Sequence, residues 1–154
     1  ALGGLKFFLL KYAPATNFIF DRERSISLEG ETGAYCQYAY ARASSILRKL
    51  DDADLQVTRD YTALDSDQAR AVLTAMLAFP GEVSSAALEY KPSLVTRAVF
   101  ELAKSFAAFY NHPQCRVIGV EPGAMAARAA LVRCARKMLG GGLALLGIDA
   151  LDEM

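Results

Sequence analysis

The sequence contains no tryptophan, one histidine and no cysteine pair with the C-x-x-C spacing. Its cysteines, Cys36, Cys115 and Cys134, are odd in number and far apart, so neither a disulfide framework nor a zinc site is indicated. Such cysteines fit a reducing cytosol. No uninterrupted apolar run reaches the ~18–20 residues that a bilayer-spanning helix needs. We therefore expect a cytoplasmic protein with no metal and no membrane partner.

The charges of the chain balance. Lysine and arginine together number 17, aspartate and glutamate together number 17, and the formal net charge is +0. Affinity for nucleic acid therefore cannot come from global charge and would need a local basic patch. Hydrophobic residues make up 53% of the 154 residues, which excludes a disordered chain and suits one domain with a substantial core.

Apolar residues recur at helical spacing along most of the chain, and no strand-type alternation is sustained. The pattern predicts helices over about residues 2–12, 31–50, 66–79, 82–90, 93–111 and 122–139, with residues 17–27 as an irregular connector. The acidic stretch 51–60 is typical of a solvated loop. We therefore predict an all-α fold, a bundle of about five to six helices with short connections.

Local chemistry marks where these helices begin and end. Thr32, and either Ser66 or Asp65, are good N-cap residues, and Pro122 suits a first helical turn. Pro80-Gly81 predicts a break between two helices. Gly140-Gly141-Gly142 predicts the end of the last helix, or a kink after which the helix resumes to Leu146.

One stretch combines aromatic and cationic side chains on a predicted helix. At about 100° per residue, a stripe covering roughly one sixth of the circumference carries Tyr35, Tyr38, Arg42 and Lys49. Exposed rings can stack on unpaired bases, and cations can meet phosphates. Tyrosines on helices also pack against cores, so both interpretations of Tyr35 and Tyr38 stay open. The cations on the same stripe favour RNA binding.

The last predicted helix is basic. Residues 124–139 contain no acid, and their cations are Arg128, Arg133, Arg136 and Lys137. These side chains cover about half of the helix circumference, opposite an apolar face. Such a surface can contact phosphates, or it can be an ordinary solvated face.

Residues 29–42 read EGETGAYCQYAYAR and look like the EGxTGPYLQYAHAR signature of arginyl-tRNA synthetases. Residues 2–10 and 18–21 resemble the family's approach to that signature, residues 92–111 resemble its P…LYELAxxFxxFYN segment, and residues 143–154 resemble its GLxLLGI…ERM end. The paired tyrosines are kept, and the departures within the signature are Ala34, Cys36 and Tyr40. Together these ordered matches cover most of the chain.

The resemblance implies which residues bind RNA. In the family, the two tyrosines of the signature and the following arginine meet the anticodon loop, which implies the same for Tyr35, Tyr38 and Arg42. A second family contact region corresponds to residues 111–117, where this chain has His112 and Arg116 instead of the frequent aromatic, and the family's final Met implies a contact by Met154. With the cations described above, the predicted RNA-binding residues are Tyr35, Tyr38, Arg42, Lys49, His112, Arg116, Arg133, Arg136 and Met154.

The resemblance also implies a division of the chain. Residues 1–28 would connect to a catalytic domain, through a stem-contact helix and linker, and residues 29–154 would form the helical DALR anticodon-binding domain. The whole enzyme joins arginine to its tRNA with ATP and Mg. The implied partners are arginine tRNA, whose middle anticodon cytosine this domain would read, and the catalytic domain of the same synthetase. Because the chain opens on Ala1 inside a helical pattern, we expect an excised piece of that enzyme.

No catalytic site is expected in the chain itself. A single histidine excludes the His-x-Gly-His motif of class I synthetases, and no Gly-x-x-x-x-Gly-Lys-[Ser/Thr] loop occurs. We expect no catalytic residue, no cofactor and no activity from this chain alone. The alternative is a helical protein–protein interaction scaffold with no RNA role, in which tyrosine and arginine anchor a partner helix.

Overall fold

The structure is a computed structural model and describes residues 2–13, 16–21, 23, 25, 27–50, 58 and 60–154. Its helices are α1 (Leu2–Leu10), α3 (Gly33–Arg48), α4 (Asp67–Glu89), α5 (Pro92–Asn111) and α6 (Pro122–Leu145), with short 3₁₀ turns at Thr62–Leu64 and Pro113–Cys115. No strand occurs in the described residues. The predicted all-α bundle is therefore confirmed. Most of the acidic stretch 51–60 lies outside the described residues.

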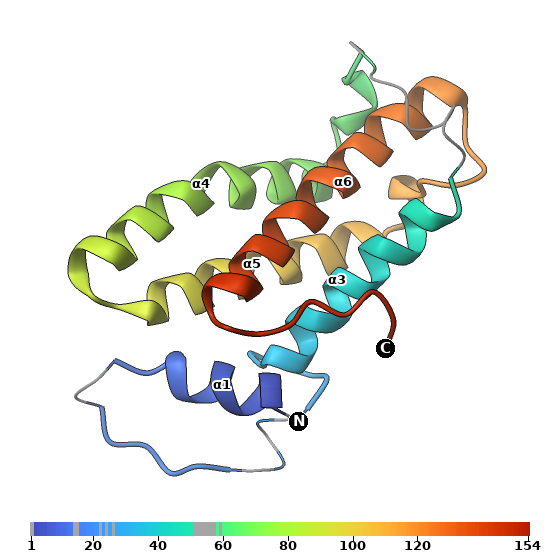
Figure 1. The fold of residues 1–154 in the computed structure, drawn as a ribbon. Coiled ribbons are helices and arrows are strands. Elements are labelled where there is room, and N and C mark those ends of the chain that lie inside the picture. Colours follow the sequence, from blue (N-terminus) through green and yellow to red (C-terminus); the bar gives the residue numbers. More distant parts are fainter. Residues whose placement is uncertain are drawn as a thin grey trace.

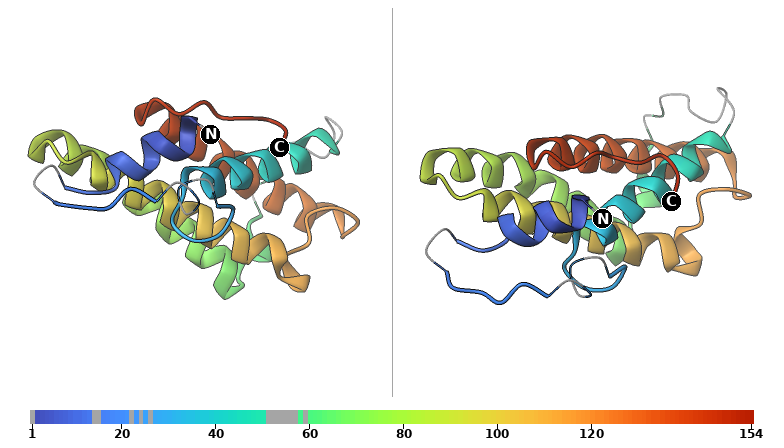
Figure 2. Two further views of the ribbon diagram at one scale, coloured as in Figure 1. Left: turned by 90° about the horizontal axis from the view of Figure 1, so that it is seen from below. Right: turned by 60° about the horizontal axis from the view of Figure 1, so that its bottom comes forward.

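The helices pack around one apolar core. α4 and α5 form an antiparallel pair, α6 lies beside them, and α3 packs against both α5 and α6 (Figure 1). α1 crosses the base of the bundle and contacts α3 and α5. The last segment of the chain runs back along α6 toward α3 (Figure 2). The largest fully buried side chains include Phe7, Phe106, Phe109, Leu102 and Leu139.

The helix starts follow the local chemistry of the sequence. The hydroxyls of Thr32 and Ser66 each accept a hydrogen bond from the backbone N–H three residues on, at 3.1 and 3.2 Å. Both residues are therefore N-caps, as predicted. Pro92 and Pro122 occupy the first turns of α5 and α6. The carboxylate of Glu121 caps α6, and these backbone hydrogen bonds lower its pKa.

α4 continues through Pro80 and Gly81, so the predicted break at this dipeptide is wrong. A proline inside a helix removes a backbone hydrogen bond and costs about 3 kcal/mol. Neighbours on both sides of Pro80 hold the helix in place, because Phe79 is buried and Val83 packs against the core. Packing against α5 therefore outweighs the local preference for a break.

α6 also continues through its three glycines, so the alternative that ends the helix there is wrong. Gly142 is buried where α6 crosses the other helices. A Cβ at this position would lie 2.4 Å from Cγ2 of Val99 and 2.8 Å from Cζ of Phe79. A glycine is therefore required for the close approach of α4, α5 and α6 rather than for ending the helix.

The end of α6 is set by Gly147, one residue past Leu146. Gly147 has a positive φ of 65°, a conformation that glycine adopts without strain. Its N–H donates to the carbonyl of Ala144, and the N–H of Ile148 donates to that of Leu143, both at 2.9 Å. These bonds form a Schellman motif, which reverses the chain and starts the last segment back along the bundle.

α4 is an outer helix, and by length and composition it could cross a membrane, with an 18-residue window of mean hydropathy 1.4. From the lack of a long uninterrupted apolar run we expected no membrane-spanning helix. The mean hydropathy of this window is nevertheless high, because its many alanines offset its polar residues. Only 17% of that window is buried. One such helix is weak evidence for a span, and the Glu82 carboxylate within α4 pairs with Arg97 at 3.0 Å, a charge pair that hydrocarbon disfavours.

We predict that Gly142→Ala destabilises the domain by roughly 1–3 kcal/mol, because the new Cβ overlaps Val99 and Phe79. The matched control is Gly141→Ala on the same helix, where a Cβ meets nothing within 4 Å. The control should raise the free energy of unfolding by up to about 1 kcal/mol, as alanine favours helices. Denaturant unfolding followed by circular dichroism measures both. Equal effects of the two variants would contradict the packing described here.

Candidate nucleic-acid interface

An open hollow of about 730 Å³ lies between the outer face of α3, the end of α5, the following loop and the last residues of the chain. We call it the hollow. Its charged lining residues are Arg42, Arg48, Lys49, Arg116, Asp152 and Glu153. Cations therefore outnumber acids in it, which supplies the local basic patch that a neutral chain needs in order to attract phosphates.

Arg42 is held between two aromatic rings in the hollow. Its guanidinium carbon lies 4.3 Å from the ring centre of Tyr38 and 4.6 Å from that of Tyr110. Its Nη2 donates to the hydroxyl of Tyr38 at 2.7 Å, and its Nη1 donates to Oδ1 of Asn111 at 3.5 Å. Cation–π contacts and these hydrogen bonds fix a normally flexible side chain. The result is a pre-ordered unit of two rings and one cation.

Tyr35 lies on the same helix but does not line the hollow. Its ring is half-buried and packs against Phe100, with the ring centres 5.7 Å apart. Burial raises the pKa of the Tyr35 hydroxyl. The ring therefore extends the core, as the structural interpretation of a helical tyrosine expects. Its predicted contact with RNA stays a prediction.

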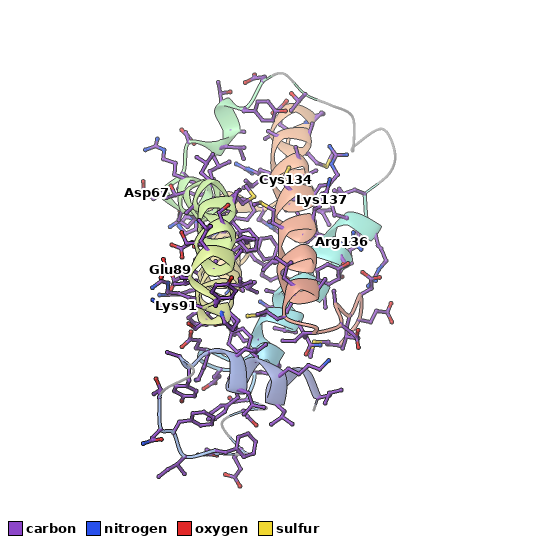
Figure 3. All side chains as sticks on the ribbon, turned by 60° about the vertical axis from the view of Figure 1, so that its left-hand side comes forward. Asp67, Glu89, Lys91, Cys134, Arg136 and Lys137 are labelled. Carbon is purple, nitrogen blue, oxygen red and sulfur yellow. The ribbon has the colours of Figure 1, made fainter. Side chains whose placement is uncertain are left out.

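Arg128 and Arg136, two of the cations of α6, contact the protein itself. Arg128 Nη1 donates to the carbonyl of Arg116 at 2.8 Å. Arg136 lies on the side of α6 that faces α3 (Figure 3), where its Nε donates to Oγ of Ser44 at 2.6 Å. Arg133 is exposed on α6, outside the lining of the hollow. Part of the basic face of α6 thus serves tertiary structure.

The remaining predicted residues divide between the hollow and its surroundings. Arg116 and Met154 line the hollow. His112 ends α5 and is half-buried, with its Nδ1 3.9 Å from Sγ of Cys115. Of the predicted residues, the structure therefore brings together Tyr38, Arg42, Lys49, Arg116 and Met154, and it leaves outside the hollow Tyr35, His112, Arg133 and Arg136.

Tyr110 and Arg48 also line the hollow, and neither is among the residues predicted from the sequence. Tyr110 follows the buried Phe109 and is 42% exposed. The sequence could have indicated Tyr110 as a binding residue only because it is an aromatic residue on the polar side of a helix end. No local spacing connects Tyr110 to Arg42, because the two meet only when α5 packs against α3.

The hollow offers aromatic rings and cations. Within the described part of the chain, no group of histidine, cysteine, aspartate or glutamate side chains could hold a metal ion. Aromatic faces suit unpaired bases, and arginine and lysine suit the phosphates between them. The arrangement therefore suits binding of a flexible, unpaired nucleic-acid strand.

Comparisons with known proteins show the family to which the chain belongs. The family described as "DALR anticodon binding domain" matches residues 36–154. The arginine–tRNA ligase of Clostridium acetobutylicum is 39% identical over 153 residues, which are 99% of this chain and 27% of that protein. The arginine–tRNA ligase of Pyrococcus furiosus is 36% identical over 163 aligned residues, 100% of this chain and 25% of that protein.

Solved structures of arginyl-tRNA synthetases are also similar to this chain. The chain is similar to Thermus thermophilus arginyl-tRNA synthetase with a TM-score of 0.90 and 34% identity, over 99% of this chain and 26% of that one. The arginyl-tRNA synthetase of Plasmodium falciparum shares the fold, with a TM-score of 0.85 at 22% identity over 99% of this chain and 27% of that one. The chain belongs to the DALR anticodon binding domain family. It spans about a quarter of the length of the curated relatives it matches.

We predict that Tyr35 contributes more to the stability of the fold than Tyr110 does. Tyr35→Ala should lower the free energy of unfolding by roughly 1–3 kcal/mol, because its ring packs against Phe100 and the core. Tyr110→Ala is the matched control and should cost less than about 1 kcal/mol, since this ring is largely a partner of Arg42. Thermal and urea unfolding measure both variants. An equally small effect of both would mean that Tyr35 is not anchored in the core.

Proposed function

We propose that this chain is the anticodon-binding domain of an arginyl-tRNA synthetase and that the hollow binds the anticodon loop of arginine tRNA. The observation that carries the proposal is Arg42, held between Tyr38 and Tyr110 in a basic hollow. Membership of the DALR anticodon binding domain family supports the assignment, as do relatives that are arginine–tRNA ligases.

Each part of the hollow has a distinct task in this proposal. The rings of Tyr38 and Tyr110 receive unstacked bases, and each stacked base contributes roughly 1–3 kcal/mol. Lys49 and Arg116 meet phosphates at the rim and give the affinity its salt dependence. Arg42, which has guanidinium N–H groups beyond those bonded within the protein, donates to a base edge, and such contacts provide specificity. A cytosine at the middle anticodon position is the expected base.

The proposal places this chain within a longer enzyme. Residues 29–154 form the anticodon-binding domain, and residues 1–28 connect it to a catalytic domain that uses ATP and Mg to join arginine to tRNA. In support, Phe8, Tyr12 and Phe18 form an aromatic cluster, with Tyr12 and Phe18 stacked at 4.5 Å between ring centres. None of these three residues belongs to the main core, although Phe7, on the same helix as Phe8, does. Binding energy gained at the anticodon then positions the distant acceptor end of the tRNA.

A helical interaction scaffold is the second candidate, and the outer face of α4 favours it. Leu77 and Leu88 are 81% and 82% exposed on that face. A scaffold that uses α4 needs no RNA affinity in the hollow, so an RNA titration separates the two candidates. The ordered unit at Arg42 favours the RNA-binding proposal.

We predict that the chain binds an anticodon stem-loop of arginine tRNA more tightly than the same stem-loop with its middle cytosine changed. Arg42→Gln should weaken binding of the cytosine loop by at least about tenfold, a loss of about 1.4 kcal/mol, because a pre-ordered donor is removed. Fluorescence anisotropy at two salt concentrations measures the affinities. Binding should weaken as the salt concentration rises.

The matched control for this titration is Arg97→Gln, which removes the same charge. Arg97 pairs with Glu82 across α4 and α5 and lies roughly 20 Å along α5 from Tyr110, at about 1.5 Å per residue. The affinity of the Arg97→Gln variant for the cytosine stem-loop should stay within about twofold of that of the parent chain, since exposed ion pairs contribute little. Equal losses in both variants, or no preference for cytosine, would contradict the proposed function.

A further inference from the structure

The last residues of the chain, 149–154, cross back over α3 and end at the hollow (Figure 2). We call this segment the tail. Its path begins at Ile148, which is buried at 2% exposure. Nε2 of Gln37 on α3 donates to the carbonyl of Asp149 at 2.7 Å. The tail is therefore guided onto α3 from its first residue.

The strongest attachment of the tail is at Asp152. Its Oδ1 accepts hydrogen bonds from Oγ of Ser44 at 2.8 Å and from Nη2 of Arg136 at 2.9 Å. Ser44 is buried and also accepts from Nε of Arg136 at 2.6 Å, so the three side chains close a ring of hydrogen bonds. Nη1 of Arg48 donates to the backbone carbonyl of Asp152 at 3.1 Å. One residue thus joins the tail to both α3 and α6.

The neighbouring acid is attached much less firmly. Oε1 of Glu153 lies 3.4 Å from Nη2 of Arg48, and the side chain of Glu153 is 83% exposed. This single exposed ion pair contributes little, whereas Asp152, whose side chain is 58% exposed, also accepts hydrogen bonds from Ser44 and Arg136. Met154 follows at the wall of the hollow, so its position depends on where Asp152 is held.

We propose that Asp152 is a positioning residue that fixes the tail and thereby places Met154 in the wall of the RNA-binding hollow; this inference rests on the function proposed above. A carboxylate beside an RNA site repels phosphates, so on charge alone Asp152 would weaken RNA binding. Its bonds to Ser44 and Arg136 give it the opposite net effect. Arg136 serves the same purpose, because its guanidinium binds Asp152 and Ser44 and stacks 4.9 Å from the ring centre of Tyr40.

Two neutralising variants separate position from charge. Asp152→Asn and Glu153→Gln each remove one negative charge from adjacent residues of the same hollow. We expect Asp152→Asn to weaken binding of the cytosine stem-loop by at least about fivefold, because the charge-assisted bond to Arg136 is lost. Glu153→Gln should instead strengthen binding by up to about threefold, because it removes a negative charge from the hollow and breaks only an exposed ion pair with Arg48. Strengthening by both variants would show a purely electrostatic role and would overturn the inference.

A double-mutant cycle tests whether Asp152 acts through Met154. Asp152→Ala and Met154→Ala should each weaken RNA binding, and the double variant should be no weaker than the more affected single variant within about twofold. A double variant whose loss equals the product of the two separate losses would overturn the inference.

Amide ¹⁵N relaxation without RNA keeps this inference separate from the proposed function. The steady-state ¹⁵N NOE of Glu153 and Met154 reports how ordered the tail is on the ps–ns timescale. Asp152→Ala should lower this NOE markedly and leave that of the helices unchanged, while Asp152→Glu should restore part of it. An unchanged NOE in Asp152→Ala would overturn the role of Asp152 whatever the RNA result. If the parent chain binds no stem-loop, the proposed function and the role of Met154 fail together, and the relaxation measurement alone decides whether Asp152 fixes the tail.

Discussion

Small side chains on α3 and α6 let these two helices pack closely against each other. Ala39 and Ala43 on α3 and Ala135 on α6 are buried, and a Cβ on Gly140 would lie 3.0 Å from the ring of Tyr40. Burial of these residues takes up only part of each helix surface. The opposite side of α3 therefore stays open and forms a wall of the hollow, while the close approach brings Arg136 of α6 within reach of α3 and the tail. The core and the proposed binding surface thus depend on the same contact.

The helix boundaries that could be predicted are those set by neighbouring residues. Thr32, Ser66 and Pro122 act within one helical turn, so their effects are visible in the sequence. Pro80 misled the prediction because its local preference for a break is overcome by the packing of α4 against α5, the next helix, and this packing does not show in the residues next to Pro80. Gly142 misled it in the same way, because the reason for that glycine is the crossing of three helices.

The candidate site shows the same division. Tyr38 and Arg42 lie on α3 and Lys49 is its C-cap residue. Their spacing predicted that they share a face, as their place in the hollow bears out. Residue spacing could not predict that Tyr35 packs on Phe100, because Tyr35 lies at the border between the exposed stripe of α3 and the buried core. Tyr110 could not be paired with Arg42 from the sequence, and a chain of zero net charge gave no indication of where its cations gather. Such facts depend on tertiary packing.

Whether RNA occupies the hollow can be read from a map of the contact surface. The ¹⁵N-labelled chain would be titrated with the cytosine stem-loop while its amide resonances are followed. We expect the largest shifts on the outer face of α3 from Tyr38 to Lys49, around Tyr110 and Arg116, and in the tail. Shifts concentrated on the outer face of α4, with the hollow unaffected, would contradict RNA binding in the hollow.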